Sequence, residues 1–159
     1  MKIALGADHA GFELKEKVRE HLQKHGYDVQ DEGTTSNESV DYPDFAKKVA
    51  EDVVEKRADL GILVCGSGVG MSIAANKVAG IRAANAATEY EAQYSREHND
   101  ANVLALGARI VDPPAAFAIV DTFLKTTFAG GRHQRRVDKI MAIEREEFEK
   151  MEQAAEKKG

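Results

Sequence analysis

The chain has 159 residues, of which 43% are hydrophobic and 31% charged, a composition typical of one soluble globular domain with a substantial core. Its formal net charge of −5 disfavours broad binding to nucleic acids, because phosphate backbones attract basic surfaces. A single cysteine excludes an internal disulfide, and no apolar run reaches the roughly 18 residues of a membrane span, so we expect a cytoplasmic protein with no membrane partner.

Short apolar runs alternate with helical periodicities along the whole chain. In chain order we predict a strand at 2–7, a helix around 14–22, a strand at 27–33, a helix at 43–53, a strand at 59–64, a helix from about 71, a strand at 80–86, a helix at 88–98, a strand at 102–108, and helices at 113–128 and 130–159. The polar strand at 27–33 suits a sheet edge. The continuous apolar run at 59–64 is typical of a parallel strand covered on both faces.

This alternation predicts a doubly wound, Rossmann-like α/β fold with three layers and a five-stranded parallel sheet. Ligands of such sheets bind outside the carboxyl ends of the strands. That rule selects four loops, at 6–11, after Gly33, at 65–70 and after Arg109. We expect one domain over 1–143 and a polar helical extension over 144–159, which cannot bury much alone and therefore either reaches across a dimer or frays.

The glycine-rich stretch at 65–70, CGSGVG, fails both familiar nucleotide motifs. Gly6 and Gly11 have the spacing of a P-loop, but Phe12 and Glu13 replace its lysine and hydroxyl residue. In the dinucleotide fingerprint, Met71 takes the place of the third glycine. Alternating glycines can still turn several amide N–H groups toward one anion or developing oxyanion. The alternative is a tight turn in which glycine serves packing alone.

Cys65 ends the strand that leads into this glycine loop. A free cysteine is most often a small buried hydrophobe, and that reading stays open. Its place at a strand tip, beside a helix N-terminus and a group of amides, favours a thiolate that acts as nucleophile or general base. Ser67 can hydrogen-bond the thiolate or a substrate oxygen.

Several polar side chains outside this loop have both a functional and a structural interpretation. Asp8 and His9 end the first strand, and His98 and Asn99 precede the fifth; helix capping explains each position equally well. The histidine spacing offers only His21 and His25 at i, i+4, near a helix end, so we expect no metal site.

Three arginines could form an anion site. Arg132 and Arg136 lie at i, i+4 on a helix and form a fork suited to one phosphate, which Arg109 could join. The alternative is a solvated basic turn.

Taken together, these segments resemble the ribose-5-phosphate isomerase B family, which includes galactose-6-phosphate and allose-6-phosphate isomerases. The resemblance lies in GADHAGFELK, VDYPDFA, GILVCGSGVGMSIAANKVAGIRAA, SREHNDANVLALGAR and GGRHQRRV, in this order, and extends to about Ile143. It implies aldose–ketose isomerisation of a phosphosugar, ribose 5-phosphate to ribulose 5-phosphate, without metal or organic cofactor. The polar tail after Ile143 is not covered.

The resemblance also implies the catalytic roles. Cys65 would move a proton between C1 and C2 through an enediolate, with Ser67 assisting. His98 would protonate the ring oxygen, and Asp8 would take part in hydroxyl binding and ring opening. Backbone amides would hold the developing oxyanion, from Gly66, Ser67, Gly68, Val69 and Gly70.

The substrate-binding roles follow from the same resemblance. His9, Arg109, Arg132 and Arg136 would hold the phosphate, and Asn99 a sugar oxygen. The family forms dimers or tetramers with active sites shared between subunits, which would bring His98 and Asn99 to a partner's strand tips. Two alternatives remain open: a six-carbon phosphosugar as substrate, and a phosphosugar-binding module without catalysis.

Overall fold

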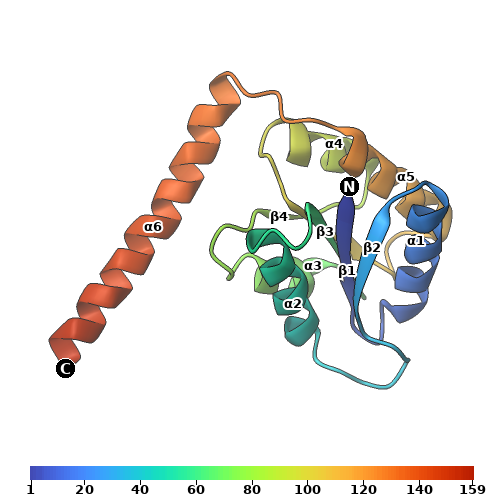
Figure 1. Ribbon diagram of the computed structural model, residues 1–159, viewed down its shortest axis with the longest axis horizontal. Helices are drawn as coiled ribbons and strands as arrows, with labels where there is room; N and C mark the ends of the chain where they lie inside the picture. Colours follow the sequence, from blue (N-terminus) through green and yellow to red (C-terminus); the bar gives the residue numbers. More distant parts are fainter.

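The structure is a computed structural model that describes all residues, 1–159. Strands and helices alternate up to the last two helices, as Figure 1 shows. In chain order the elements are β1 Lys2–Ala7, α1 Phe12–Lys24, β2 Asp28–Gly33, α2 Tyr42–Val54, β3 Leu60–Cys65, α3 Val69–Ala75, β4 Ala83–Asn85, α4 Glu89–Glu97, β5 Val103–Gly107, α5 Pro113–Lys125 and α6 Arg132–Lys158. The predicted α/β fold is confirmed.

All five strands are parallel and form one sheet in the order β2-β1-β3-β5-β4. β2 lies at an edge, as its polar sequence predicts. β3 lies in the centre, and its last residue, Cys65, is in register with Gly107 at the end of β5. The carboxyl ends of β1, β3 and β5 therefore meet at one edge of the sheet.

Helices cover both faces of the sheet and give the three predicted layers (Figure 1). On one face, α1, α4 and α5 bury a cluster that includes Val18, Ala92 and Phe123 against alternate residues of the central strands. On the other face, α2 and α3 bury a smaller cluster that includes Val49 and Met71. Cys65 belongs to this second cluster, so its side chain leaves the sheet on the side of α2 and α3.

β4 is shorter than the predicted strand at 80–86, and side chains explain the difference. The carboxylate of Glu144 accepts the Gly80 N–H at 3.1 and 3.2 Å. The Asn102 amide donates to the Gly80 carbonyl at 2.9 Å and accepts the Arg82 N–H at 2.8 Å. These backbone groups are satisfied outside the strand ladder, so regular pairing starts only at Ala83.

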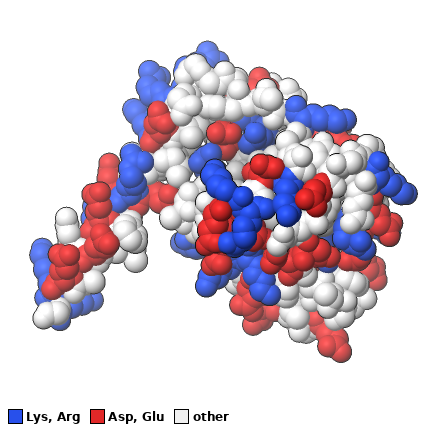
Figure 2. Space-filling model, viewed as in Figure 1, with Lys and Arg blue, Asp and Glu red and all other residues white.

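α6 projects away from the α/β body (Figure 1). Val137 is its buried residue, and every residue from Arg145 onward is exposed. Figure 2 shows basic and acidic side chains alternating along this projecting helix. Despite its 27 residues, α6 is too polar to cross a membrane, and no other helix has the length and apolar character to do so.

Candidate active site

An open pocket of about 570 Å³ lies at the carboxyl edge of the sheet, where β1, β3 and β5 end. Three of the four loops selected from the sequence line it. Its walls are Asp8, His9, Ala10, Tyr42, Cys65, Gly66, Ser67, Val69, Gly70, Ile73, Arg109 and Ile110. From the remaining loop, after Gly33, only Tyr42 reaches the pocket, and in the structure it is the first residue of α2.

The thiol of Cys65 is held by the loop that follows it. Cys65 is 5% exposed, and its Sγ accepts a hydrogen bond from the Gly68 N–H at 3.1 Å. Gly68 has φ +83°, and a Cβ there would lie 2.3 Å from Oδ1 of Asn85. Glycine is therefore required at 68 for both conformation and space, and that requirement aims an amide at the sulfur.

Ser67 stabilises the same loop through two hydrogen bonds. Its Oγ accepts the Val69 N–H at 3.2 Å, and its carbonyl oxygen accepts a hydrogen bond from Asn85 Nδ2 at 3.5 Å. The family resemblance predicts that the amides from Gly66 to Gly70 hold a substrate oxyanion. Of these, the Gly68 and Val69 N–H groups form hydrogen bonds within the loop.

Asp8 and His9 shape the wall next to β1. Asp8 is 9% exposed, and its Oδ1 accepts the Gly11 N–H at 3.0 Å. Nδ1 of His9 accepts the Val40 N–H at 3.2 Å, which ties the long loop before α2 to the pocket. Both side chains are thereby fixed at the rim, where a ligand can reach them.

Arg109 places a positive charge beside the glycine loop. Its backbone N–H donates to the Gly66 carbonyl at 3.0 Å, and a Cβ at Gly66 would lie 2.9 Å from its Nη1. Tyr42 lies still closer to Gly70, where a Cβ would be 2.3 Å from the ring. Tyr42 is not among the predicted site residues, although it lies in the VDYPDFA segment and in the predicted loop after Gly33.

His98, Asn99, Arg132 and Arg136 do not line this pocket. His98 caps the end of α4, and its N–H donates to the Tyr94 carbonyl at 2.9 Å. That turn leads into the amino end of β5, whereas Cys65 stands at the carboxyl end of β3. The two groups are separated by the length of a strand, roughly 15 Å for five residues.

His133 belongs with this second group, although its role was not predicted. Its ring stacks on that of His98 with centroids 4.2 Å apart and planes 8° from parallel. Desolvation against its neighbours lowers the pKa of His133, and the charges of His98, Arg132 and Arg136 lower it further. The positive charge of the arginines attracts an anion to this surface and disfavours a proton on His133.

No group of three or more His, Cys, Asp or Glu side chains is placed to hold a metal ion. The pocket at the carboxyl edge instead joins a thiol, a carboxylate, an imidazole and a guanidinium. A thiol within reach of a substrate can act as base or nucleophile. An arginine beside amide donors can hold an anionic group.

Comparisons with known proteins agree with this chemistry. Residues 3–140 match the family described as Ribose/Galactose Isomerase. The ribose-5-phosphate isomerase B of Escherichia coli (strain K12) is 54% identical over 143 residues, which are 90% of this chain and 96% of that protein. The "Putative sugar phosphate isomerase" of Rickettsia bellii (strain RML369-C) is 50% identical over 87% of this chain and 96% of its own length.

Two solved structures extend the similarity to the fold. The Clostridium thermocellum ribose-5-phosphate isomerase B superposes with a TM-score of 0.91 at 57% identity, covering 92% of this chain and 99% of that one. The Mycoplasma genitalium ribose-5-phosphate isomerase B, solved with bound ribulose-5-phosphate, gives 0.88 at 47% identity, covering 91% and 97%.

The matched range includes both groups of candidate side chains, from Asp8 to Arg136, and ends within α6. The curated and structural relatives align over nearly their full lengths. This chain therefore belongs to the ribose/galactose isomerase family.

Proposed function

We propose that this protein is a sugar-phosphate isomerase that interconverts ribose 5-phosphate and ribulose 5-phosphate through an enediolate, with Cys65 as the base. The observation that carries the proposal is the thiol of Cys65, held by the Gly68 amide in a pocket with Asp8 and Arg109. The relatives named ribose-5-phosphate isomerase B support the substrate.

The proton transfer is centred on the sulfur. The Cys65 thiolate takes the proton from C2 of the open-chain aldose, and the electrons of that C–H bond form the enediolate. The thiol then returns the proton to C1, while a proton moves from the oxygen on C2 to that on C1, so that no atom is gained or lost. Ser67 lines the same pocket as the sulfur and assists this exchange of hydroxyl protons.

Negative charge grows on the substrate oxygens during this step. Donors already fixed in place stabilise such charge without reorganising, which is a large catalytic term. Because the Gly68 and Val69 amides are bonded within the loop, we assign the oxyanion contacts first to the Gly66 and Gly70 ends of the loop. The Gly68 amide instead holds the sulfur of Cys65 in position.

The ring-opening group comes from a second subunit. We propose a homodimer in which His98 and Asn99 of one protomer reach the pocket of its partner. The support is the separation of these residues from Cys65 by the length of a strand within one chain. His98 then protonates the ring oxygen, with Asp8 on the hydroxyl side, and Asn99 binds a sugar oxygen.

The phosphate would be bound across the same interface. His9 and Arg109 line the pocket, and the partner would contribute Arg132 and Arg136 from the start of α6. The lowered pKa of His133 supports an anion-binding surface there. Phosphate binding far from the reacting carbons can position C1 and C2 against the thiolate.

We further propose that residues 1–143 form the isomerase domain and that 144–159 is an extension of α6. A free thiol used as a base suits a reducing compartment, so we place the enzyme in the cytoplasm. The description Ribose/Galactose Isomerase favours one alternative substrate class, the six-carbon phosphosugars such as allose 6-phosphate.

A coupled assay tests the proposal. Purified protein is given ribose 5-phosphate or allose 6-phosphate at equal concentration, and ketose formation is measured. We expect a higher kcat/KM with ribose 5-phosphate. Faster turnover of the six-carbon sugar would transfer the assignment to the alternative, and binding of both sugars without turnover would leave a phosphosugar-binding module.

A further inference from the structure

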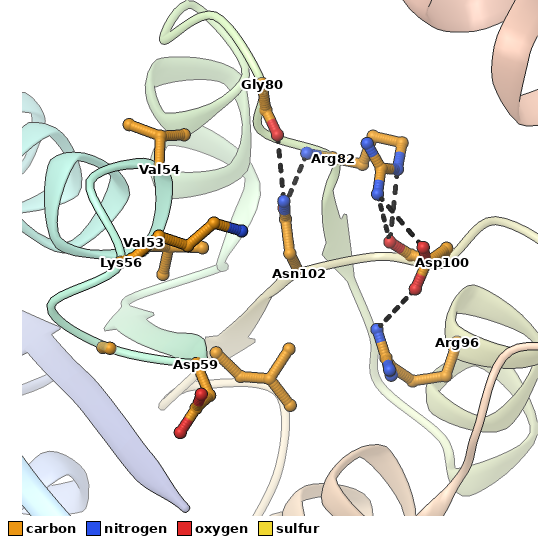
Figure 3. Close-up of a pocket in the computed structure, with 11 residues that line it drawn as sticks. Val53, Val54, Lys56, Asp59, Gly80, Arg82, Arg96, Asp100 and Asn102 are labelled. Atoms are coloured by element: carbon orange, nitrogen blue, oxygen red, sulfur yellow. Dashed lines mark hydrogen bonds and ion pairs between the residues drawn. The ribbon is translucent and has the colours of Figure 1, made fainter.

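A second cavity, of about 430 Å³, lies at the amino edge of the sheet, away from the candidate active site. Figure 3 shows Asp100 between the guanidinium groups of Arg82 and Arg96 in its wall. The contacts of these three residues run mainly to the backbone of the turn at 98–102. They therefore support that turn, which carries His98 and Asn99.

The turn contains an unusual backbone position. Asp100 has φ +47°, and its N–H donates to the Arg96 carbonyl at 3.1 Å. A left-handed residue with this bond ends a helix in the way that glycine usually does. An aspartate is less favourable than glycine in this conformation. Its carboxylate, unlike a glycine, can form ion pairs with Arg82 and Arg96.

Arg82 and Arg96 bind three successive carbonyls of the turn. Arg82 donates from Nε to the Asn99 carbonyl at 3.0 Å and from Nη2 to the Asp100 carbonyl at 2.8 Å. Arg96 donates from Nη1 to the Ala101 carbonyl. The planar guanidinium can hold several acceptors in a fixed geometry, which a lysine cannot do.

The Asp100 carboxylate neutralises the pair of cations. Its Oδ1 lies 3.2 Å from Nη1 of Arg96, and its Oδ2 lies 3.5 Å from Nη2 of Arg82. Burial lowers the pKa of Arg96 and the nearby Arg82 adds to this, whereas Asp100 raises it. Without the carboxylate, two half-buried guanidinium groups would face each other uncompensated.

The same cluster reaches α6. Nη1 of Arg82 donates to Sδ of Met141 at 3.3 Å, and the adjacent Gly80 N–H is held by Glu144. About two turns nearer the start of α6, His133 stacks on His98. Arg82 thus connects the turn with His98 to the helix with Arg132 and Arg136.

We propose that Arg82, Arg96 and Asp100 are positioning residues that fix His98 and Asn99 for ring opening, without touching the substrate. This inference rests on the proposed function, which gives His98 that role. Outer groups that orient a catalytic side chain commonly affect rate by 10- to 100-fold. We expect loss of the Asp100 charge to lower kcat/KM about tenfold.

The first test compares Asp100→Asn with Asp59→Asn. Asparagine tolerates the left-handed conformation, so the turn can still form while the charge is lost. Asp59 lines the same cavity, but its Oδ2 accepts the Lys2 N–H and does not contact the turn. We expect about a tenfold fall in kcat/KM for Asp100→Asn and a value near wild type for Asp59→Asn. Equal activities in the two variants would overturn the proposal.

A double-mutant cycle then separates positioning from general destabilisation. If Asp100 acts through His98, Asp100→Asn should have little further effect in a His98→Ala background. An undiminished tenfold fall in that background would show a role unrelated to His98 and overturn the proposal. Arg82→Lys provides a second variant should Asp100→Asn fold poorly; it keeps the charge and loses the fixed hydrogen bonds, and we expect a similar fall.

A measurement without turnover distinguishes failure of this inference from failure of the proposed function. The NMR resonances of the His98 ring report its position in the full-length protein. We expect their chemical shifts to change in Asp100→Asn and to stay at the wild-type values in Asp59→Asn, whichever sugar the enzyme converts. Unshifted His98 resonances would reject the positioning role, while wild-type activity from His98→Ala would reject the ring-opening role alone.

Discussion

His98 and His133 stack face to face, with ring centroids 4.2 Å apart, at the junction of α4 and α6. Neither histidine lines the pocket around Cys65. Desolvation lowers the pKa of His133, and the charges of His98, Arg132 and Arg136 lower it further. A proton on His133 therefore weakens the folded state.

This relationship predicts the pH dependence of stability. The pKa of His133 is lowered in the folded protein, from a value near 6.5 when unfolded, so the unfolded chain binds more protons just below pH 6.5. The contribution of His133 to stability therefore rises with pH through that window and levels off above it. Urea unfolding of wild type and His133→Gln at fixed protein concentration, from pH 5 to 7, should show this difference. A stability difference that fell with rising pH would contradict the sign.

Replacing Cys65 should remove turnover while leaving binding intact. A general base contributes about 10²- to 10⁴-fold to rate, and we expect Cys65→Ala to lower kcat by that order. Calorimetric titration with ribose 5-phosphate should still detect binding, because the proposed phosphate contacts come from His9 and three arginines and not from the sulfur. Ser72→Ala is the matched control: its Oγ donates to the Val69 carbonyl in α3 and does not line the pocket. Normal turnover by Cys65→Ala would reject the base.

Gly68 and Gly26 form a matched pair for testing the loop. Both have φ +83°, but a Cβ at Gly68 would lie 2.3 Å from Asn85 Oδ1, whereas a Cβ at Gly26 meets nothing within 4 Å. Gly26→Ala should cost about 1–2 kcal/mol of stability from backbone strain alone and leave kcat near wild type. Gly68→Ala should cost more and lower kcat about 100-fold, because the amide on Cys65 moves. Chemical unfolding and the coupled assay measure both effects, and similar kcat values would contradict the role of this amide.

Mixing two inactive variants tests the shared active site. A heterodimer of Cys65→Ala and His98→Ala protomers contains one intact site and one doubly altered site. Random exchange in an equal mixture should restore about a quarter of wild-type activity. Either variant mixed with itself provides the baseline. If subunit exchange is verified by mass spectrometry and no activity returns, each site is built within one chain.

Truncation after Glu144 tests whether residues 145–159 contribute to the stability of a single subunit. Residues 145–159 are exposed throughout, with Phe148 and Met151 at 60% and 71%. A chain ending at Glu144 keeps the contact with Gly80, so we expect a thermal midpoint within about 2 °C of the full-length protein. Glu144→Ala should lower it further than the truncation does. A larger loss on truncation would show that the extension packs on a second copy.

Much of the fold could be predicted because its signals are local. Apolar runs and helical spacing gave five strands in the right places, and Pro43 and Pro113 lie in the first turns of α2 and α5. The strand order could not be predicted, because hydrophobic periodicity does not say that β5 pairs between β3 and β4. The start of β4 was also missed, since it depends on Asn102 and Glu144, which are distant in sequence.

In the candidate site, too, local sequence signals predicted some contacts, whereas contacts that depend on long-range packing were missed. The rule on strand ends brought Asp8, Cys65 and Arg109 together, because it depends only on parallel strands sharing an edge. The stacking of His133 on His98 depends on where α6 turns, and the packing of Tyr42 on Gly70 depends on the path of the loop before α2. No periodicity or motif in the sequence encodes either contact.

The placement of Cys65 and His98 at opposite edges of one sheet has a kinetic consequence. If neither subunit holds a whole set of reacting groups, the concentration of working sites is set by association. Well above the dissociation constant of the dimer, rate is proportional to protein. Far below it, rate would follow the square of protein concentration, and a phosphosugar that bridges the two chains would hold them together by mass action. Dilution would then lower the activity per subunit, and added substrate would restore it by stabilising the dimer.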